Sequence, residues 1–330
     1  MADQLGTDNV RAYLAGRGVL PASTAEVSEF PGGVSGVTLL VDTGQQRLVV
    51  KQALSRLRVE KDWRSDPRRA VVEARALLAY SRITPEATPT LVDVDPERCA
   101  FTMSAAPDGT GTWKQQLLAG DVDVSVATAV GSILGRWHAA TAGADEAGGF
   151  SDRTWFEELR VAPFYRAVML ARPDLADAVA ERLRCMLEEE SQVLVHGDFS
   201  PKNVLVKPDG GVWIVDFEVA HRGDPVFDLA FLVHHLLLKA VHLPMYGGRL
   251  LECARAALAA YHAVPGAADI EHQHLMGHIG CLTLARVLGT SPASYLTAEE
   301  RDIAEAIGSE LVAHPSRDLQ EAWPSHERTA

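Results

Sequence analysis

The stretch that decides the fold comprises residues 193–216 and reads VLVHGDFSPKNVLVKPDGGVWIVD. It opens with an apolar run that ends in His-Gly-Asp at residues 196–198, and a polar loop then continues to Asn203. Two short apolar runs flank Pro-Asp-Gly-Gly and predict a β-hairpin, because these four residues have turn chemistry. The hairpin delivers Asp216 at its end. We therefore expect two carboxylates and one carboxamide at neighbouring strand ends.

The order of these polar residues suits phosphoryl transfer. An aspartate such as Asp198 can accept the proton of an attacking hydroxyl group, and an asparagine five residues later can bind a metal ion. A second aspartate can then bridge the metal and a triphosphate. The alternative is a loop whose acidic residues only cap strand ends, and it leaves the ordered set unexplained.

The same residues carry a resemblance to a known family. His196-Gly197-Asp198 with Asn203 resembles the H-G-D-x-x-x-x-N catalytic loop of aminoglycoside phosphotransferases and related small-molecule kinases, and it is similar to the catalytic loop of protein kinases. Asp216-Phe217-Glu218 stands where that family has its metal-binding aspartate. The resemblance implies an α+β, bilobal, protein-kinase-like fold. A small β-rich N-terminal lobe over residues 1–103 and a larger, mainly helical C-terminal lobe over residues 104–330 are expected.

Composition and charge narrow the class of protein. A chain of 330 residues with 47% hydrophobic and 23% charged residues is typical of a globular protein. The formal net charge of −13 disfavours non-specific nucleic-acid binding, which depends on Lys and Arg. The most apolar window, residues 227–238, contains one Asp and two His and is too short to span a bilayer, so no membrane partner is expected.

The N-terminus and the cysteines favour a cytoplasmic location. The N-terminal residues are acidic and lack the apolar run of a signal peptide. The four cysteines are scattered and form no C-x-x-C pair, so buried free thiols in a reducing compartment are expected. The sequence leads to no prediction about the oligomeric state.

The sequence before the central stretch contains candidate residues for binding the phosphates of a nucleotide. A hairpin is predicted over residues 37–53, directly after the Gly-rich turn PGGVSG at residues 31–36. Amides of such a turn can approach phosphates, with Gly33 and Ser35 as candidates, although hairpin turns are also Gly-rich for conformational reasons. The resemblance makes Lys51 the lysine that holds the α- and β-phosphates of ATP. The alternative is an edge-strand lysine that faces water.

A helix is predicted to begin at Asp66-Pro67, with the aspartate as N-cap and the proline at the first helical position. Glu73 falls within the apolar stripe of this helix, and a carboxylate in that position needs a cation. We expect Lys51 to be the partner. The alternative is a surface ion pair between Glu73 and Arg69, four residues earlier.

A linker of small residues with Pro and Gly, residues 104–109, follows a second predicted hairpin over residues 91–103. The resemblance makes this linker the hinge between the lobes, where backbone groups bind adenine. By position, Met103 would flank the adenine. The carbonyl of Ser104 and the amide of Ala106 would contact the edge of the base.

Outside these segments, the spacing of apolar residues predicts mainly helices. They cover residues 5–18, 113–118, 126–137, 155–170, 175–189, 229–239, 247–263, 268–287 and 298–312. His138 is expected to pack in the core. The resemblance makes Asp228 a support for the catalytic loop through backbone hydrogen bonds. The tail from residue 314 is expected to be loosely ordered.

The resemblance also implies a mechanism with ATP and Mg²⁺ as cofactors. Asp198 would be the catalytic base for transfer of the γ-phosphate to a hydroxyl group of a small molecule. Asn203 and Asp216 would hold Mg²⁺, with Glu218 as a third candidate ligand. His196 would brace the loop. The segment after Asp216 is short, which favours a small acceptor over a protein substrate.

The acceptor can be narrowed only to a class of small hydroxylated molecules. Glu218 in place of the glycine of D-F-G resembles methylthioribose kinase, although Asn203 departs from that group. A sugar or methylthioribose-type kinase is therefore an alternative, and a non-catalytic nucleotide-binding pseudokinase is another. Asp224, His235 and Arg286 are candidate acceptor contacts, because burying polar groups without partners is costly. They could instead be a loop cap, a core histidine and a solvated helix arginine.

Overall fold

The computed structural model describes residues 4–21, 25–30, 36–54, 66–143, 149–189 and 192–324. The chain divides into two units. The first contains Met1–Asp108 and Trp213–Val219, and the second contains Gly109–Val212 and Ala220–Ala330. The lobe boundary expected at residue 104 stays a prediction.

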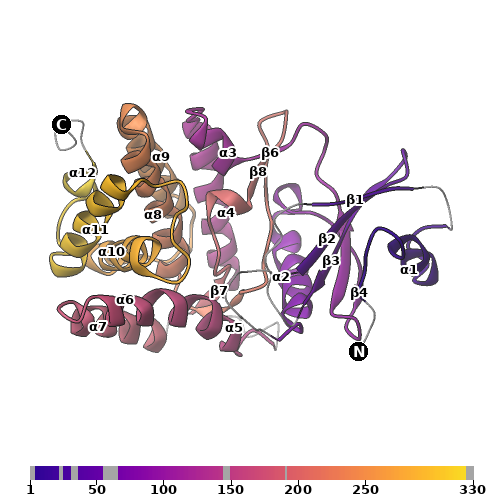
Figure 1. The fold of residues 1–330 in the computed structure, drawn as a ribbon, viewed down its shortest axis with the longest axis horizontal. Helices are drawn as coiled ribbons and strands as arrows, with labels where there is room; N and C mark the ends of the chain where they lie inside the picture. Colours follow the sequence, from indigo (N-terminus) through magenta and orange to yellow (C-terminus); the bar gives the residue numbers. More distant parts are fainter. Residues whose placement is uncertain are drawn as a thin grey trace. The chain divides into compact units, whose positions relative to one another are not determined.

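The first unit is built on a five-stranded antiparallel sheet (Figure 1) of order β1-β2-β3-β5-β4. The strands are β1 (Glu26–Glu29), β2 (Gly36–Asp42), β3 (Arg47–Ala53), β4 (Leu91–Asp95) and β5 (Ala100–Ser104). Lys51 on β3 lies opposite Thr38 of β2 on one side and opposite Phe101 of β5 on the other. Because β3 is a central strand, the alternative that placed Lys51 on an edge strand is wrong.

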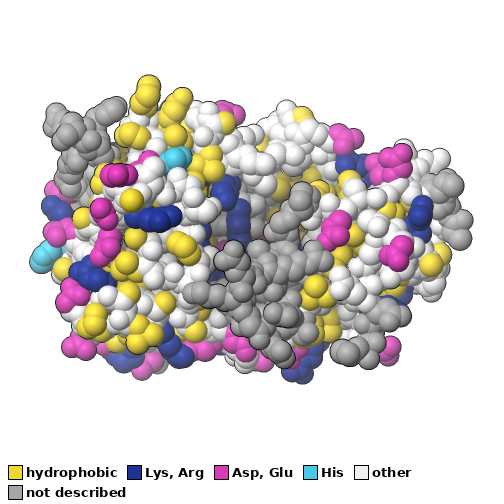
Figure 2. Space-filling view, in the orientation of Figure 1, with side chains coloured by type: hydrophobic (Ala, Val, Ile, Leu, Met, Phe, Trp, Pro, Cys, Tyr) yellow, Lys and Arg dark blue, Asp and Glu magenta, His cyan; other side chains and the backbone are white. Residues whose placement is uncertain are grey.

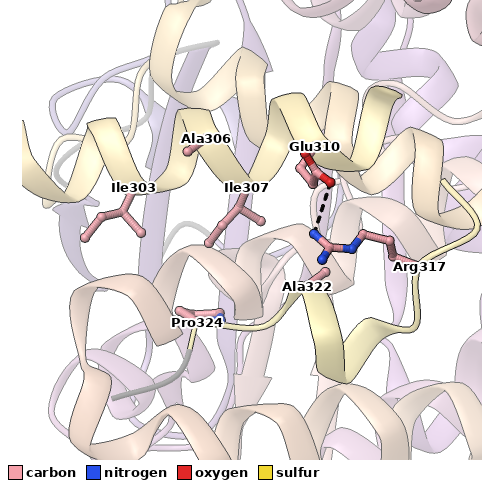
Figure 3. A pocket seen from close by; sticks show the side chains of 7 residues that line it. All are labelled: Ile303, Ala306, Ile307, Glu310, Arg317, Ala322 and Pro324. Atoms are coloured by element: carbon pink, nitrogen blue, oxygen red, sulfur yellow. Dashed lines mark hydrogen bonds and ion pairs between the residues drawn. The ribbon is translucent and has the colours of Figure 1, made fainter. Parts of the chain in front are cut away.

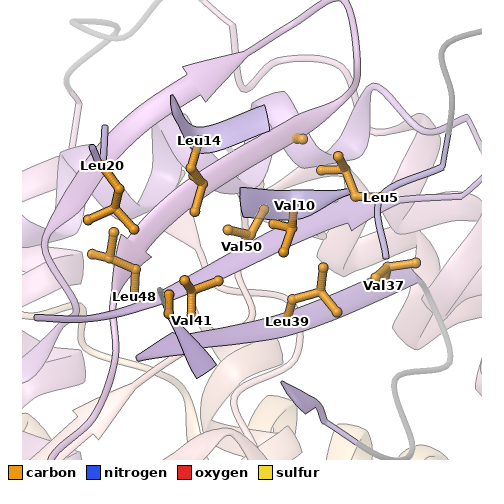
Figure 4. Packing of buried hydrophobic residues seen from close by; sticks show 11 residues of the cluster. Leu5, Val10, Leu14, Leu20, Val37, Leu39, Val41, Leu48 and Val50 are labelled. Carbon is orange, nitrogen blue, oxygen red and sulfur yellow. The ribbon is translucent and has the colours of Figure 1, made fainter. Parts of the chain in front are cut away.

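One face of this sheet carries the hydrophobic core of the first unit (Figure 4). Alternate residues of a strand point to the same face, and in β2 these are Val37, Leu39 and Val41. They pack with Val10 and Leu14 of α1 (Val10–Gly16). Helix α1 begins later than the predicted residue 5, because the side chain of Asn9 accepts the amide of Gly6 (2.9 Å) and forms a turn before it.

Helix α2 (Arg69–Ile83) packs against β3, β4 and β5 of the same unit. It begins two residues after the predicted start. The carboxylate of Asp66 accepts the amide of Arg68 (2.9 Å), so this aspartate closes the turn that precedes the helix instead of capping the helix itself. A short 3-10 helix, η1 (Pro85–Ala87), follows.

The second unit is mainly helical (Figure 1). Its α-helices are α3 (Trp113–Leu118), α4 (Val124–Thr141), α5 (Thr154–Phe156), α6 (Ala167–Ala171), α7 (Ala176–Glu188), α8 (Val226–His242), α9 (Gly247–His262), α10 (His272–Leu288), α11 (Ala298–Ala313) and α12 (Leu319–Ala322). Helix α8 is buried on nearly every side by α9, α10 and α11, as its almost continuous apolar sequence requires. Within the described ranges, no helix is long and apolar enough to cross a membrane.

Short strands flank the segment from His196 to Asn203. Strand β7 (Val193–Val195) pairs with β10 (His221–Gly223), and β8 (Val204–Val206) pairs with β6 (Gly111–Thr112). After the 3-10 helix η3 (Pro201–Asn203) and β8, the amide of Gly210 donates to the carbonyl of Lys207 (2.9 Å) and closes the predicted turn. Strand β9 (Val212–Ile214) then carries the chain into the segment of the first unit that contains Asp216.

The helix predicted over residues 155–170 is instead three consecutive segments. Between α5 and α6 lies η2 (Glu157–Arg166), a π-helical segment that contains Pro163. Proline has no amide hydrogen and crowds the preceding turn, so the hydrogen-bond pattern of an α-helix is not kept through this position. The prediction of one regular α-helix is therefore wrong here.

The C-terminal residues up to 324 are anchored, so the expectation of a loose tail from residue 314 is wrong for this part. Trp323 is buried, and its Nε1 donates to the carbonyl of Gly247 (2.9 Å). The segment lines a pocket of about 440 Å³ with α11 (Figure 3). An ion pair between Arg317 and Glu310 (3.2 Å) lies at one end, and none of the predicted site residues lines the pocket.

The cysteines are free thiols, as predicted. Cys253 and Cys281 are buried, but Cys99 and Cys185 are only half-buried. On the face shown in Figure 2, acidic and basic side chains are interspersed. The described residues of this face therefore do not form the continuous basic surface that nucleic-acid binding uses.

Candidate active site

The predicted catalytic loop, residues 196–203 of the second unit, is held in shape by hydrogen bonds among its own residues. Strand β7 leads into His196, which is fully buried, and Nδ1 of this histidine accepts the amide of Asp198 (3.1 Å). The amide of Ser200 donates to the carbonyl of Asp198 (2.8 Å), and the amide of Asn203 donates to the carbonyl of Ser200 (2.9 Å). His196 therefore braces the loop, as predicted.

Asp228 supports this loop by hydrogen bonds to its backbone. Its carboxylate is fully buried and accepts the amides of His196 (2.7 Å) and Gly197 (2.9 Å). Nε2 of His138 lies 3.3 Å from the same carboxylate. Burial raises the pKa of Asp228, but His138, His196 and the hydrogen bonds outweigh it and lower the pKa below its ordinary value. The expected support for the catalytic loop and the expected core position of His138 are both confirmed.

The carboxylate of Asp198 is only 3% exposed and has three donors around it. Nδ2 of Asn203 donates to Oδ2 of Asp198 (2.9 Å), and Nζ of Lys202 lies 2.8 Å from the same oxygen. The guanidinium of Arg160 lies 3.1 Å from it and also donates to the carbonyl of Gly197 (2.7 Å). These donors compensate the burial of the negative charge and fix the orientation of the carboxylate.

Arg160 is a site residue that sequence reasoning missed. It lies on η2, and its guanidinium also packs over the rings of Phe164 (5.8 Å) and Phe231 (5.6 Å). In the sequence it is one of two arginines on the helix predicted over residues 155–170. Only Pro163, three residues later, marked the segment as irregular.

Asn203 offers an oxygen to a metal ion. Its Nδ2 donates to the backbone and side chain of Asp198, whereas its Oδ1 accepts no hydrogen bond from any residue that the structure describes. An amide oxygen is a ligand type that Mg²⁺ accepts, so this side of the predicted site fits the metal. The other predicted ligand, Asp216, belongs to the first unit. Joint coordination by the two residues stays a prediction.

In the first unit, Lys51 holds two carboxylates. Its Nζ lies 2.5 Å from Oε1 of Glu73 and 2.8 Å from Oδ1 of Asp216. The predicted pairing of Lys51 with Glu73 is confirmed, and the alternative partner Arg69 is wrong. Burial lowers the pKa of Lys51, but Asp216 and Glu73 outweigh it and raise the pKa above its ordinary value. Burial raises the pKa of Glu73 to about 7, although Lys51 opposes this shift.

Asp216, which pairs with Lys51, has a strained backbone. Its φ of 74° lies in the left-handed region, which residues other than glycine rarely adopt. Next to it, the ring of Phe217 packs against Tyr80 of α2 at 5.3 Å. The ion pair with Lys51 and this ring contact hold the strained segment in place.

Arg69 and Glu218 form an ion pair that the sequence did not reveal. Nε of Arg69 lies 3.0 Å from Oε2 of Glu218, and the side chain of Arg69 is 0% exposed. The guanidinium also donates to the carbonyls of Leu54 (2.9 Å) and Asp66 (3.2 Å). The charge of Glu218 is thus already balanced within the first unit, and its role as a metal ligand stays a prediction.

Replacement of Arg69 by methionine is expected to lower the free energy of unfolding by about 3–5 kcal/mol, because it leaves the carboxylate of Glu218 without its cation. The neighbouring Arg68→Met is the matched control. Arg68 is 75% exposed in its ion pair with Asp66, and an exposed pair contributes less than about 1 kcal/mol. Urea denaturation measures both, and equal losses for the two variants would refute the structural role of Arg69.

The geometry of the two units can now be compared with known proteins. The model of the phosphotransferase enzyme family matches residues 26–269. The chain belongs to this family. The matched range includes Lys51, Asp198, Asn203 and Asp216, the four residues on which the resemblance depends.

A curated relative gives a further point of comparison. Methylthioribose kinase of Pectobacterium atrosepticum is 25% identical to the chain over 229 residues, which are 62% of this chain and 57% of that protein. The chain thus spans little more than half the length of this relative.

Solved structures share the fold of this phosphotransferase family member. The microcompartment-associated aminopropanol kinase is similar with a TM-score of 0.58 and 16% identity over 95% of this chain and 98% of that chain. Choline kinase from Streptococcus pneumoniae is similar with a TM-score of 0.57 and 13% identity over 93% of this chain and 98% of that chain. At such identities the likeness concerns the fold alone. The predicted α+β, protein-kinase-like fold is confirmed.

The predicted adenine contacts of this phosphotransferase family member lie at the end of β5. Met103 and Ser104 are its last two residues, and Ala106 follows. The carbonyl of Ala106 accepts Nη1 of Arg47 (3.3 Å), whereas its amide donates to no residue in the described part of the chain. That amide is therefore available to a base, and the adenine contact stays a prediction. Gly33 and Ser35 lie outside the described residues.

The structure does not bring the three candidate acceptor contacts together. Asp224 accepts the amide of Val226 (2.8 Å) and pairs with Nε2 of His274 (2.7 Å) near the start of α10. Arg286 lies twelve residues after His274 on this helix, which is about 18 Å at about 1.5 Å per residue. One small acceptor does not span that distance. Asp224 closes the turn that precedes α8, and its position gives no support for contact with the acceptor.

His235 and Arg286 both lie in partly buried surroundings. The ring of His235 packs against Phe231 at 5.2 Å, and burial lowers its pKa well below the ordinary value. Arg286 donates through Nη1 to the carbonyl of Ser291 and to its hydroxyl (2.9 Å). Its Nε is buried and has no hydrogen-bond partner among the described residues. The alternative of a solvated helix arginine is wrong.

Lys239 is a further buried polar residue of the second unit. It lies within the apolar sequence of α8 and is 1% exposed. Its Nζ donates to the carbonyl of His235 (3.2 Å) and lies 5.7 Å from the ring centre of Tyr295. No carboxylate pairs with it in the described part of this family member. The only signal in the sequence was a lysine inside an otherwise apolar run.

Proposed function

We propose that this chain transfers the γ-phosphoryl group of ATP to a hydroxyl group of a small molecule. The observation that carries the proposal is the carboxylate of Asp198, which is almost buried and oriented by Asn203, Lys202 and Arg160. It lies on the loop that resembles the catalytic loop of small-molecule kinases. Membership in the phosphotransferase enzyme family supports the same reaction.

Each residue has a defined part in this reaction. Asp198 orients the acceptor hydroxyl and accepts its proton as the phosphoryl group is transferred. Lys51, fixed by Glu73, holds the phosphates that are not transferred. Asn203 and Asp216 would hold Mg²⁺, which neutralises charge on the transferred group when it is bound with ATP. Asp228 and His196 keep the loop rigid.

The size of the acceptor follows from the segment after Asp216. Asp224, in the turn before α8, follows only eight positions later, so the chain has no long platform for a protein substrate at this point. Four free cysteines accord with a reducing compartment such as the cytoplasm, where ATP is available. A pseudokinase receives no support, because the catalytic aspartate, the lysine and both proposed metal ligands are all present.

A sugar kinase of the methylthioribose type is the second candidate. It is favoured by the 25% identity to methylthioribose kinase and by the Asp216-Phe217-Glu218 sequence. The second candidate would use Glu218 as a ligand of the metal ion, and the ion pair between Glu218 and Arg69 competes with that use. Methylthioribose therefore belongs in any panel of acceptors.

A screen for acceptor-dependent formation of ADP tests the proposal. The purified chain is incubated with ATP and Mg²⁺ and with aminoglycosides, sugars, sugar phosphates, nucleosides, amino alcohols or methylthioribose. We expect one class to stimulate ADP formation at least about tenfold and the Asp198→Asn variant to lose the stimulation. Stimulation that is equal in both proteins, or no stimulation by any class, would refute the proposal.

A further inference from the structure

Five cations of the second unit interact electrostatically with Asp198 or with one another. They are Lys114 on α3, Arg160 on η2, Lys202 on η3, Lys239 on α8 and Arg286 on α10. Arg160 and Lys202 pair with Asp198. The other three have no carboxylate partner among the residues that the structure describes. We call Lys114, Lys239 and Arg286 the unpaired cations.

Contacts through Tyr295 connect two of the unpaired cations. Nζ of Lys239 lies 5.7 Å from the ring centre of Tyr295. Arg286 is tied to the loop that carries this tyrosine, since it donates to Ser291 and its carbonyl accepts the amide of Ala293 (2.8 Å). The hydroxyl of Tyr295 and Nε of Arg286 are both buried without a hydrogen-bond partner in the described chain. The region therefore contains unused donors as well as unpaired charge.

Lys114, the third unpaired cation, lies on a helix that packs against the catalytic loop. Helix α3, which carries Lys114, packs against η3, which carries Lys202. Burial lowers the pKa of Lys114, and repulsion from Arg286 and Lys202 adds to the effect. Burial also lowers the pKa of Arg286, while Tyr295 and Asp198 oppose the shift. The unpaired cations thus repel one another, and Arg286 is also attracted by Asp198.

Such an arrangement is unfavourable in the absence of a partner. A buried charge needs an opposite charge and hydrogen bonds to compensate its lost hydration. Burial lowers the pKa of Lys239 to about 7, and Lys114 and Arg286 add to this shift. Asp198 already pairs with two other cations and cannot neutralise all five. A cationic acceptor would add repulsion, whereas an anionic group would satisfy both the charges and the unused donors.

Building on the proposed function, we propose that the acceptor carries an anionic group, a phosphate or a carboxylate, besides the hydroxyl that Asp198 deprotonates. Arg286 and Lys239 bind this group directly, and Lys114 adds its charge. Arginine presents a planar set of donors that matches the oxygens of either anion. The acceptor class is therefore an alcohol with a phosphate or carboxylate, such as a sugar phosphate or a hydroxy acid.

Binding of matched pairs of small molecules tests this inference without any turnover. Ribose and ribose 5-phosphate, glycerol and glycerol 3-phosphate, and glycerol and glycerate are titrated calorimetrically into the full chain saturated with AMP-PNP and Mg²⁺. We expect the anionic member to bind about 10- to 100-fold more tightly in at least one pair. The phosphate and carboxylate pairs separate the two kinds of anion.

Variants of Arg286 and Lys239 test whether these two cations cause the tighter binding of the anionic molecules. Arg286→Gln and Lys239→Met should each remove most of the preference for the anionic member. Arg255→Gln on α9 is the matched control, since this exposed arginine contacts Gln320 and Asp318 at the surface, and it should keep the preference. Equal affinity within every pair, or a preference that persists in both variants, would overturn the anion site.

Two further outcomes separate this inference from the proposed function. If AMP-PNP removes a preference that the nucleotide-free chain shows, the cations serve the phosphates of the nucleotide and the inference is wrong. An uncharged alcohol that is phosphorylated as well as its anionic counterpart would also overturn it, but would leave the kinase activity standing. Anion binding without any transfer that depends on Asp198 would keep the anion site and refute the proposed function.

A stability measurement tests the burial of the unpaired charge separately. Lys239→Met should raise the melting temperature of the ligand-free chain by several degrees at pH 6. The folded-state pKa of about 7 lies below the ordinary value of 10.5, so the wild type gains stability as the pH rises through this window. The advantage of the variant should therefore shrink between pH 7 and about pH 10. A variant that is destabilised at every pH would identify Lys239 as an ordinary packing residue and contradict its part in the inference.

Discussion

Replacement of Asp198 by asparagine is expected to lower kcat by about 10²–10⁴-fold while nucleotide binding stays unchanged. Asparagine keeps the size and the hydrogen-bonding shape of the side chain, but it cannot accept the proton of the acceptor hydroxyl. Nucleotide binding is assigned to other residues, including Lys51 in the first unit. Steady-state kinetics with the stimulating acceptor give kcat, and calorimetric titration of AMP-PNP gives the nucleotide affinity.

Asp209→Asn provides a matched control for this experiment. Asp209 is exposed in the turn after β8, where its carboxylate accepts the amide of Gly211 (2.9 Å). This variant should keep the wild-type kcat. Near-wild-type turnover in Asp198→Asn would remove this residue from the catalytic role. A parallel loss of nucleotide affinity would show that the substitution disturbs more than proton transfer.

Replacement of Asp228 by alanine should lower the free energy of unfolding by about 3–5 kcal/mol and should also lower kcat. The carboxylate of Asp228 is fully buried, and it accepts the two backbone amides at the start of the catalytic loop. Without it these amides have no acceptor, His138 loses its charged partner, and Asp198 is no longer held in one position. Urea denaturation measures the stability, and the KM for ATP reports on nucleotide binding.

Two companion variants sharpen this result. Asp228→Asn retains one side-chain oxygen and can serve one of the two amides well, so its loss of stability should lie between that of the wild type and that of the alanine variant. Asp302→Ala, an exposed position on α11, should change the unfolding free energy by less than about 0.5 kcal/mol. A stability of Asp228→Ala close to that of this control would contradict the supporting role.

Local patterns predicted those parts of the site that depend on neighbouring residues. The loop from His196 to Asn203 lies between two short apolar strands, and its turn chemistry can be read from the sequence. Glu73 falls within the apolar stripe of a helix, so its need for a cation was visible, and Lys51 was the cation available on a neighbouring strand. These features follow from spacing and burial alone.

Features that depend on distant parts of the chain were missed. Arg69 and Glu218 are 149 residues apart, and nothing in either local sequence selects the other as a partner. Arg160 reaches the catalytic loop from a π-helical segment, and periodicity analysis assumes a regular helix. The same limit explains Trp323, because its contact with Gly247 anchors a tail that a local pattern describes as loose.

The acceptor contacts show a third limit. Asp224 and Arg286 both interrupt apolar segments, and this pattern cannot tell whether two such residues face one site. The structure separates them along α10, since Asp224 pairs with His274 near the start of the helix. It also selects Lys239, which the pattern treated as part of an apolar run. Burial without a carboxylate partner is a three-dimensional property, and it is the property that distinguishes this lysine.

The most direct test of the proposed reaction is ³¹P NMR spectroscopy of the chain with ATP, Mg²⁺ and the acceptor that gives the fastest ADP formation. We predict that the γ-phosphate signal of ATP disappears as the signals of ADP and of a new phosphate monoester grow. The Asp198→Asn variant should form the monoester about 10²–10⁴-fold more slowly. Inorganic phosphate as the only phosphorus product besides ADP, or monoester formation at equal rates in both proteins, would contradict an Asp198-dependent transfer to an alcohol.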